Sequence, residues 1–271
     1  MKSISIIGAG HLGSALARGL IKKGLSPKTI RVSNRNHHKL TRLVDELSVV
    51  PEASNREAVM HSDVVILAVK PQYIYELCQE IASVVQQKRP LIISLAAVTE
   101  IAHLCQWLGI DDLPMIRVMT NTPMEFCRGT SALFANQFVS AADKKIAETL
   151  FNNVGSAFWL DKEQLLDPLT VAIGSAPAYV LLFMEAIQKA AISQGVPASV
   201  AKQIAFDVTA GTAMLAEHSQ RSFTELRAGV TTPQGVTEHS LQQLSVEDFF
   251  ASFQRVYQAG NERIGQIKKT I

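Results

Sequence analysis

The residues that most directly indicate chemistry form the glycine-rich segment Gly8-Ala9-Gly10-His11-Leu12-Gly13, which follows a short apolar run. In this spacing the first glycine permits a tight turn, the second lets the backbone approach a pyrophosphate, and the third lets a helix pack closely against a strand. The phosphates would lie at the helix N-terminus, where free N–H groups and the helix dipole favour negative charge. A plain tight turn is the alternative. The residues expected to contact a dinucleotide here are Gly8, Gly10, His11, Leu12 and Gly13.

About 20 residues after this motif, where a second strand should end, the chain reads Ser33-Asn34-Arg35. Enzymes that use NAD usually place Asp or Glu here to hold the ribose 2′-hydroxyl. This segment has no carboxylate to repel a 2′-phosphate, and the guanidinium of Arg35 can pair with one bidentately. We therefore expect NADPH in preference to NADH. The alternative is that Arg35 is an ordinary solvated surface cation.

Small or polar residues follow other apolar runs in the same half of the chain. Ala68-Val69-Lys70-Pro71 ends the run that begins at Val64, and Ala96 and Asn121 follow two later runs. Asn55 precedes a short helical stretch. Ligands of open α/β sheets bind beyond the carboxyl ends of the strands, so these residues are expected to border the cofactor. Lys70 as a surface lysine and Asn121 as a turn residue are the alternatives.

A second candidate site lies far along the chain, in the run Val230-Thr231-Thr232-Pro233-Gln234-Gly235-Val236-Thr237. This Pro/Gly turn precedes a helical pattern, and a helix N-terminus offers free N–H groups that suit a small carboxylate. On the residues alone, Thr237 followed by Glu238 is equally typical of a helix N-cap. The candidate substrate-binding residues are Thr232, Gly235, Val236 and Thr237.

The elements that must position these residues change in character along the chain. Helical patterns over 12–22, 36–47 and 73–85 alternate with short apolar runs, which indicates a doubly wound, Rossmann-like α/β sheet. After Leu160 only successive helices are expected, one of them over 178–191 and entered through Pro177 at its first turn. We therefore expect a dinucleotide-binding domain over 1–162 and an all-helical domain over 163–271. The expected strands are 3–7, 29–33, 64–69, 91–95, 115–119, 131–135 and 157–160.

Composition narrows the function further. The 271 residues are 47% apolar and carry 26 basic against 24 acidic side chains, a net charge of +2 that gives no reason to expect nucleic acid or an anionic membrane. The three cysteines are far apart in the sequence, which fits a reducing cytoplasm. The adjacent His37 and His38 cannot chelate one ion together, so no metal is expected. The apolar stretch 171–187 is interrupted by Gly174, Pro177 and Glu185, so a buried interface helix is expected rather than a membrane span of about 20 residues.

Together these segments resemble the pyrroline-5-carboxylate reductase family over nearly the whole chain. The dinucleotide motif is shared by many families, whereas the Ala-Val-Lys-Pro segment at 68–71, Asn-Thr-Pro at 121–123, Pro-Ala-Tyr at 177–179 and the Thr-Thr-Pro loop, in this order, are far more specific. The resemblance implies a Rossmann-like domain followed by a helical dimerisation and substrate domain. It also implies a homodimer, which in this family is often assembled further into rings of dimers.

The resemblance implies NAD(P)H-dependent reduction of 1-pyrroline-5-carboxylate to L-proline, the last step of proline biosynthesis. Hydride transfer to the C=N carbon of a cyclic imino acid needs no strong general acid, because an iminium carbon is already electrophilic. By resemblance, the backbone N–H groups of Gly235, Val236 and Thr237 hold the substrate carboxylate and the Thr232 hydroxyl assists. The Thr237 hydroxyl is the expected catalytic group, in contact with the ring nitrogen.

The chain departs from the family pattern mainly in the Thr-Thr-Pro loop, where Gln234 replaces a glycine and Val236 replaces Thr or Ala. A change from Gly to Gln fails where the backbone needs a positive φ or where a ligand lies against it. Two alternatives therefore stay open: a reductase of a different cyclic imine or oxo acid, and a non-catalytic NADP-binding regulatory protein. A β-hydroxyacid dehydrogenase ranks last, because Lys189 lacks the Gly and Asn of the Gly-x-x-x-Lys-x-x-Asn pattern.

Overall fold

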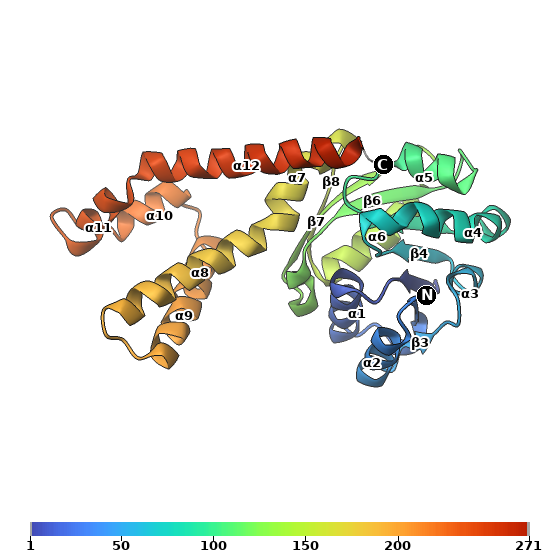
Figure 1. The fold of residues 1–271 in the computed structure, drawn as a ribbon, viewed down its shortest axis with the longest axis horizontal. Coiled ribbons are helices and arrows are strands. Elements are labelled where there is room, and N and C mark those ends of the chain that lie inside the picture. The colour runs from blue at the N-terminus through green and yellow to red at the C-terminus, as the bar shows by residue number, and fades with distance from the viewer. Residues whose placement is uncertain (1, 270–271) are drawn as a thin grey trace. The chain divides into compact units, whose positions relative to one another are not determined.

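The computed structural model describes residues 2–269 and contains two compact units, Met1–Ser175 with Gly260–Ile271, and Ala176–Ala259. The first unit is built on one eight-stranded sheet in the order β3-β2-β1-β4-β5-β6-β7-β8 (Figure 1). Neighbouring strands are parallel except for the antiparallel pair β6 and β7. The strands are β1 Ile4–Ile7, β2 Ile30–Ser33, β3 Val50–Pro51, β4 Val64–Leu67, β5 Leu91–Ser94, β6 Met115–Met119, β7 Gly129–Ala135 and β8 Gly155–Trp159.

The central strands are buried on both faces, which explains their continuous apolar sequences. All four residues of β1, β4 and β5 are buried, and Ile6 lies opposite Val32 on one side and Ile66 on the other. The order of the strands reverses between β1 and β4, and this switch point is where open α/β sheets bind ligands. The expected doubly wound sheet is therefore confirmed, with the two-residue β3 added at its edge.

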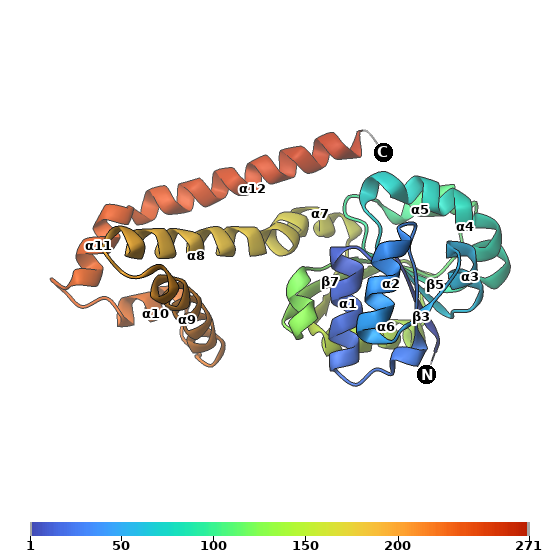
Figure 2. The same ribbon diagram turned by 60° about the horizontal axis from the view of Figure 1, so that its bottom comes forward.

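Helices cover both faces of the sheet (Figures 1 and 2). One core contains Leu16 of α1, Leu43 of α2 and Phe151 of α6, and the other contains Cys78 of α4 and Leu104 of α5. These helices are α1 His11–Lys22, α2 His37–Leu47, α3 Asn55–Met60, α4 Ile74–Lys88, α5 Ile101–Leu108 and α6 Ala141–Asn153. Short 3-10 turns span Pro27–Thr29, Pro71–Tyr73, Thr122–Phe126 and Glu163–Leu165.

Helical structure leads without a break into the helix that the sequence predicts over 178–191. The four-residue α7 (Leu166–Leu169) is followed by a π-helical turn over Thr170–Ser175 and then by α8 (Ala176–Ser193). Since α8 begins at Ala176, Pro177 lies in its first turn, as expected. A proline inside a helix lacks an N–H and crowds the carbonyl one turn earlier, and a wider π turn accommodates such a disruption.

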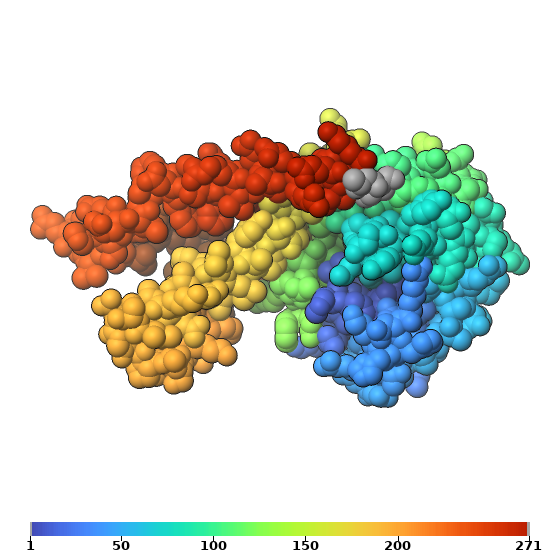
Figure 3. Space-filling model, viewed as in Figure 1, coloured from blue at the N-terminus to red at the C-terminus, as the bar shows by residue number. Residues whose placement is uncertain are grey.

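The second unit is entirely helical. Many of its large apolar side chains are exposed, among them Leu181, Phe183 and Phe206, and Figure 3 shows α8 and α12 at the surface. The helical run Glu163–Ser193 is long and apolar enough to cross a membrane by length and composition alone, which is weak evidence for a span. The helices after α8 are α9 Ala198–Glu217, α10 Phe223–Gly229, α11 Val236–Leu244 and α12 Val246–Lys268, whose last part belongs to the first unit.

Candidate functional site

The three glycines of the N-terminal motif have three different steric roles. Gly8 has φ +116°, and a Cβ there would lie 2.7 Å from the Ala68 carbonyl oxygen. A Cβ on Gly13 would lie 2.0 Å from the carbonyl oxygen of Gly8, so only glycine allows α1 to approach the turn. By contrast, a Cβ on Gly10 would meet no atom within 4 Å. Gly8 and Gly13 thus allow the close packing of the turn, and the turn is open to a ligand at Gly10.

The N-terminus of α1 faces the same turn with its first-turn N–H groups uncapped by any side chain. Gly10 is the N-cap residue, in an extended conformation and without a side-chain cap. Its carbonyl accepts a hydrogen bond from the Ser14 N–H at 2.9 Å. The first turn of a helix leaves N–H groups without intrahelical partners, and a phosphate can satisfy them. This geometry fits a dinucleotide pyrophosphate.

A cavity of about 500 Å³ opens beside this turn, at the carboxyl ends of β1, β2 and β4. Eight of the cofactor residues expected from the sequence line it: Gly8, Gly10, Asn34, Arg35, Asn55, Ala68, Val69 and Lys70. The expected residues outside the lining are His11, Leu12, Gly13, Ser33, Pro71, Ala96 and Asn121. Residues that the sequence analysis missed are Ile7, Asn36, Lys39, Tyr73 and Leu77.

The missed residues follow from local structure that the sequence signals only weakly. Asn36 is the N-cap of α2, where its side chain accepts a hydrogen bond from the Lys39 N–H at 3.0 Å. The pattern Asn36 followed by a helix is a recognisable capping signal that could have placed Lys39 in the first turn. Tyr73 and Leu77 lie at the start of α4, which begins just beyond β4, and they give the cavity an apolar wall.

Two asparagines fix the loop between β2 and α2. Asn34 accepts a hydrogen bond from the Ala9 N–H at 3.0 Å and donates to the Asn36 carbonyl at 2.9 Å, which ties this loop to the glycine turn. The Ser33 hydroxyl, buried beneath the cavity, donates to Asn55 Oδ1 at 2.8 Å. Asn55 in turn donates to Glu80 Oε2 at 2.9 Å. Ser33 therefore supports the site from below, which explains its absence from the lining.

Arg35, the residue expected to meet a 2′-phosphate, stands at the rim of the cavity. Its Nη1 lies 2.8 Å from Oε2 of Glu76 on α4, and the side chains are 56% and 58% exposed. The hydrogen bond with Glu76 raises the pKa of Arg35 above its usual value. The cation is therefore present at the expected place, but it already has an anionic partner.

Asn121 has a structural role that the sequence does not reveal. Its Nδ2 donates to the Ile173 carbonyl at 3.2 Å and its Oδ1 accepts from the Thr130 N–H at 3.0 Å. These bonds join the end of β6 to β7 and to the π turn, so the amide group is already engaged at both ends. Ala96 is buried behind the end of β5, with 4% of its surface exposed.

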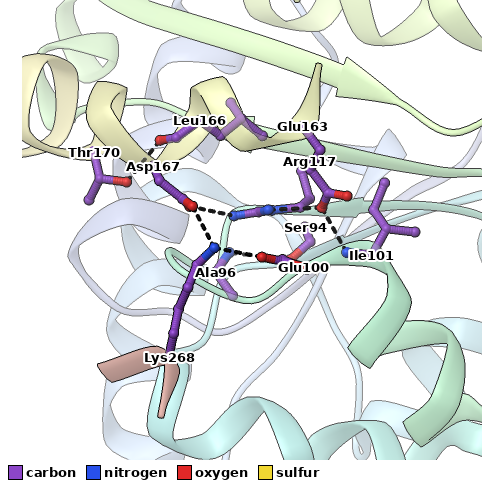
Figure 4. Close-up of polar contacts among 10 residues, drawn as sticks. All are labelled: Ser94, Ala96, Glu100, Ile101, Arg117, Glu163, Leu166, Asp167, Thr170 and Lys268. Atoms are coloured by element: carbon purple, nitrogen blue, oxygen red, sulfur yellow. Dashed lines mark hydrogen bonds and ion pairs between the residues drawn. The ribbon is translucent and has the colours of Figure 1, made fainter. Parts of the chain in front are cut away.

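A charged cluster holds α7 and the end of α12 in place within the first unit (Figure 4). The buried Arg117 of β6 lies 2.8 Å from Glu163 and 3.8 Å from Asp167, and the Glu163 carboxylate also accepts the N–H of the first residue of α5. Lys268 lies 2.5 Å from both Asp167 and Glu100. Burial alone would lower the pKa of Lys268, but these two hydrogen bonds raise it overall.

The Thr-Thr-Pro loop has a well-defined geometry of its own. Gln234 adopts φ +58°, the left-handed conformation for which a glycine is best suited. Its N–H donates to Glu238 Oε2 at 2.7 Å, and the Gly235 N–H donates to the Thr232 carbonyl at 2.9 Å. The Gly235 N–H, one of three expected to hold the substrate carboxylate, is thus used inside the loop.

The start of α11 excludes one of the two interpretations of Thr237. The helix begins at Val236, Gly235 is its N-cap residue, and no side chain caps it. Thr237 is therefore the second helical residue, and the interpretation of its hydroxyl as an N-cap is wrong. The N–H groups of Val236 and Thr237 belong to the uncapped first turn, where a carboxylate could bind.

The doubly wound sheet, the glycine turn at its switch point and the adjoining cavity define a dinucleotide-binding protein of the Rossmann type, followed by a helical unit. Residues 3–98 match a family model described as NADP oxidoreductase coenzyme F420-dependent. Residues 163–267 match one described as pyrroline-5-carboxylate reductase dimerisation.

Comparison with known proteins extends this similarity to the full chain. It is 35% identical to the pyrroline-5-carboxylate reductase of Pseudomonas aeruginosa, over 99% of this chain and 97% of that protein. It is 32% identical to that of Corynebacterium melassecola, over 99% and 100%. The solved structure of the Coxiella burnetii enzyme has a TM-score of 0.88 at 32% identity, over 98% of both chains. The chain belongs to the pyrroline-5-carboxylate reductase family.

Proposed function

We propose that this protein reduces 1-pyrroline-5-carboxylate to L-proline with NADPH as the preferred reductant and NADH as a second one. The observation that carries the proposal is the combination, in one chain of this family, of an open glycine turn at the sheet's switch point with an uncapped helix behind a Thr-Thr-Pro loop. The first suits a dinucleotide and the second a small carboxylate.

The cofactor site is assigned to the cavity beside the glycine turn. The backbone of Gly8, Gly10 and the first turn of α1 would hold the pyrophosphate, since Gly10 leaves open space and the N–H groups of that turn lack a side-chain cap. Tyr73 and Leu77 offer an apolar surface to the adenine, and Arg35 offers a cation to the 2′-phosphate. Lys70 and Asn55 border the same space.

The substrate carboxylate is assigned to the N–H groups of Val236 and Thr237, with the Thr232 hydroxyl beside them. The chemistry that a bound reduced nicotinamide supplies is hydride transfer to the C=N carbon. The Thr237 hydroxyl contacts the ring nitrogen and steers its proton. Fixing a small ring through its carboxylate and nitrogen leaves it few orientations, which is how a site without a strong acid or base can accelerate the reaction.

Self-association is the second part of the proposal. Leu181, Leu182 and Phe183 of α8 are more than half exposed, as is Phe206 of α9, and such a concentration of exposed apolar surface marks an interaction site. The match of this region to a dimerisation family supports a second copy of the chain as its cover. We propose a cytoplasmic homodimer, with rings of dimers as the larger assembly.

A second candidate function is reduction of a different cyclic imine or oxo acid. The observation that favours it is Gln234, which places a side chain in the substrate loop at a residue whose backbone is in the left-handed conformation. The same geometry shows that the backbone accommodates a residue other than glycine here, with strain of about 1–2 kcal/mol. The loop keeps a tight turn despite the replacement, so the primary candidate stands first.

Thr237→Ala tests the proposed catalytic contact. The variant should lower kcat with 1-pyrroline-5-carboxylate by about 100-fold, the smallest factor typical of a positioned proton-transfer group. The NADPH dissociation constant should stay within about twofold, because Thr237 belongs to the substrate loop rather than to the cofactor cavity.

Ser240→Ala is the matched control for Thr237→Ala. It removes a hydroxyl from the next turn of α11 that donates to the Val236 carbonyl at 2.8 Å. Equal rates for wild type, Thr237→Ala and Ser240→Ala would exclude Thr237 from the reaction.

A further inference from the structure

The cation at the rim of the cofactor cavity is shared between two elements. Arg35 follows β2, in a loop fixed by the hydrogen bonds of Asn34, and its guanidinium reaches Glu76 on α4 at 2.8 Å. Only one guanidinium nitrogen makes this contact. A guanidinium has five N–H donors, and a carboxylate and a phosphate both use them in the same fork geometry. Glu76 therefore engages the group that a 2′-phosphate would need.

The cations around this rim outnumber the carboxylates by one. Lys39 and Lys70 line the same cavity as Arg35, while Glu80 lies one helical turn beyond Glu76 on α4 and holds Asn55. Three cations thus stand against two carboxylates. The 2′-phosphate of NADPH adds a charge of about −1.5 to −2 that NADH lacks. The same five side chains cannot suit both dinucleotides equally well.

We infer that Glu76 is a specificity-determining residue, which lowers the affinity for NADPH relative to NADH by competing with the 2′-phosphate for Arg35. The inference rests on the proposed function, because it assigns the adenosine end of the cofactor to this rim. A 2′-phosphate that takes the whole fork of Arg35 displaces Glu76, whereas binding of NADH leaves the pair intact. The carboxylate that NAD enzymes usually carry at the end of β2 is absent here, and α4 supplies one from the opposite side of Arg35.

The size of the effect follows from the exposure of the pair. Both side chains are more than half exposed, so the contact itself is weak and can be broken at little cost. Because the 2′-phosphate no longer has to displace Glu76 from Arg35, removing this exposed pair should tighten binding of the phosphate by up to about fivefold. This change should affect the affinity only for ligands that carry a 2′-phosphate.

Isothermal titration calorimetry with two nucleotide probes tests the inference without any turnover. Adenosine 2′,5′-bisphosphate carries the 2′-phosphate and 5′-AMP lacks it. In Glu76→Gln the dissociation constant of the bisphosphate should fall about fivefold, and that of 5′-AMP should change less than twofold. Glu46→Gln is the matched control, since Glu46 pairs with Arg18 at 2.6 Å away from the cavity lining, and it should alter neither value.

A double variant shows whether Glu76 acts through Arg35. On an Arg35→Ala background, Glu76→Gln should tighten bisphosphate binding less than twofold, because the cation for which Glu76 and the phosphate compete is gone. An unchanged ratio of the two probes in Glu76→Gln, or weaker bisphosphate binding, would overturn the inference and leave the proposed reaction intact. Failure of the wild type to bind either probe would overturn the cofactor site itself, and the inference with it.

Discussion

Replacing Glu163 by Gln should destabilise the first unit more than any surface charge change. The variant keeps the shape of the side chain and an oxygen for the N–H of Ile101, but it removes the anion that lies 2.8 Å from Arg117 (Figure 4). Arg117 is only 3% exposed, and removal of one partner of a buried ion pair costs about 3–5 kcal/mol. Glu163 is 17% exposed and Asp167 remains 3.8 Å from Arg117, so we expect about 2–3 kcal/mol.

Thermal unfolding followed by tryptophan fluorescence measures this loss, because Trp107 and Trp159 both lie in the first unit. For a unit of this size the midpoint should fall by about 4–10 °C. Glu148→Gln is the control: Glu148 lies 2.8 Å from Lys145, which is 75% exposed, so its loss should cost under about 0.5 kcal/mol. A midpoint for Glu163→Gln equal to that of Glu148→Gln would refute the argument that the cluster of Arg117 anchors this region.

Three further predictions concern the glycine turn, the substrate loop and the acid range. Gly13→Ala should disrupt the first unit because its Cβ would lie 2.0 Å from a carbonyl oxygen, and circular dichroism would show this loss. Gly10→Ala should fold normally but bind NADPH at least about tenfold more weakly, which titration of NADPH measures. Gln234→Gly should relieve a left-handed residue without lowering kcat/KM for 1-pyrroline-5-carboxylate, and lost activity would show that the glutamine side chain is needed. The hydrogen bond from Lys268 lowers the pKa of Glu100 below its usual 4.5. The stability that this pair contributes is therefore present above pH 4.5 and is lost as the pH falls through the folded-state pKa. Lys268→Met should flatten the decline in the unfolding midpoint between about pH 5 and 3, and an unchanged slope would argue against the pair.

The parts of the fold that could be predicted from sequence are those with a strong local signal. Buried strands such as β4 are continuous apolar runs, and no other residue fits at Gly8 or Gly13 of the turn, so the sequence indicates both features. The two-residue β3 has no such signal. The π turn before α8 was not predicted, because it depends on contacts with Asn121 and Gly260 from other elements.

The candidate site was predictable where it depends on local backbone conformation and unpredictable where it depends on side chains that pair across distant parts of the sequence. Gly8 and Gly10 border the cavity because of their own conformations. The Arg35–Glu76 pair joins residues 41 positions apart, and neither side chain alone indicates it. Thr237 resembled an N-cap because Thr before Glu is a common capping pattern, whereas the turn within the loop starts the helix two residues earlier.

The most direct test of the central claim is the consumption of NADPH by the purified protein on addition of 1-pyrroline-5-carboxylate, with the product identified by chiral chromatography. The account predicts turnover that depends on the imino acid and yields L-proline in an amount equal to the NADPH consumed. Tight binding of NADPH with no turnover on this substrate would contradict the account, and the protein would then be a reductase of another substrate or a binding protein.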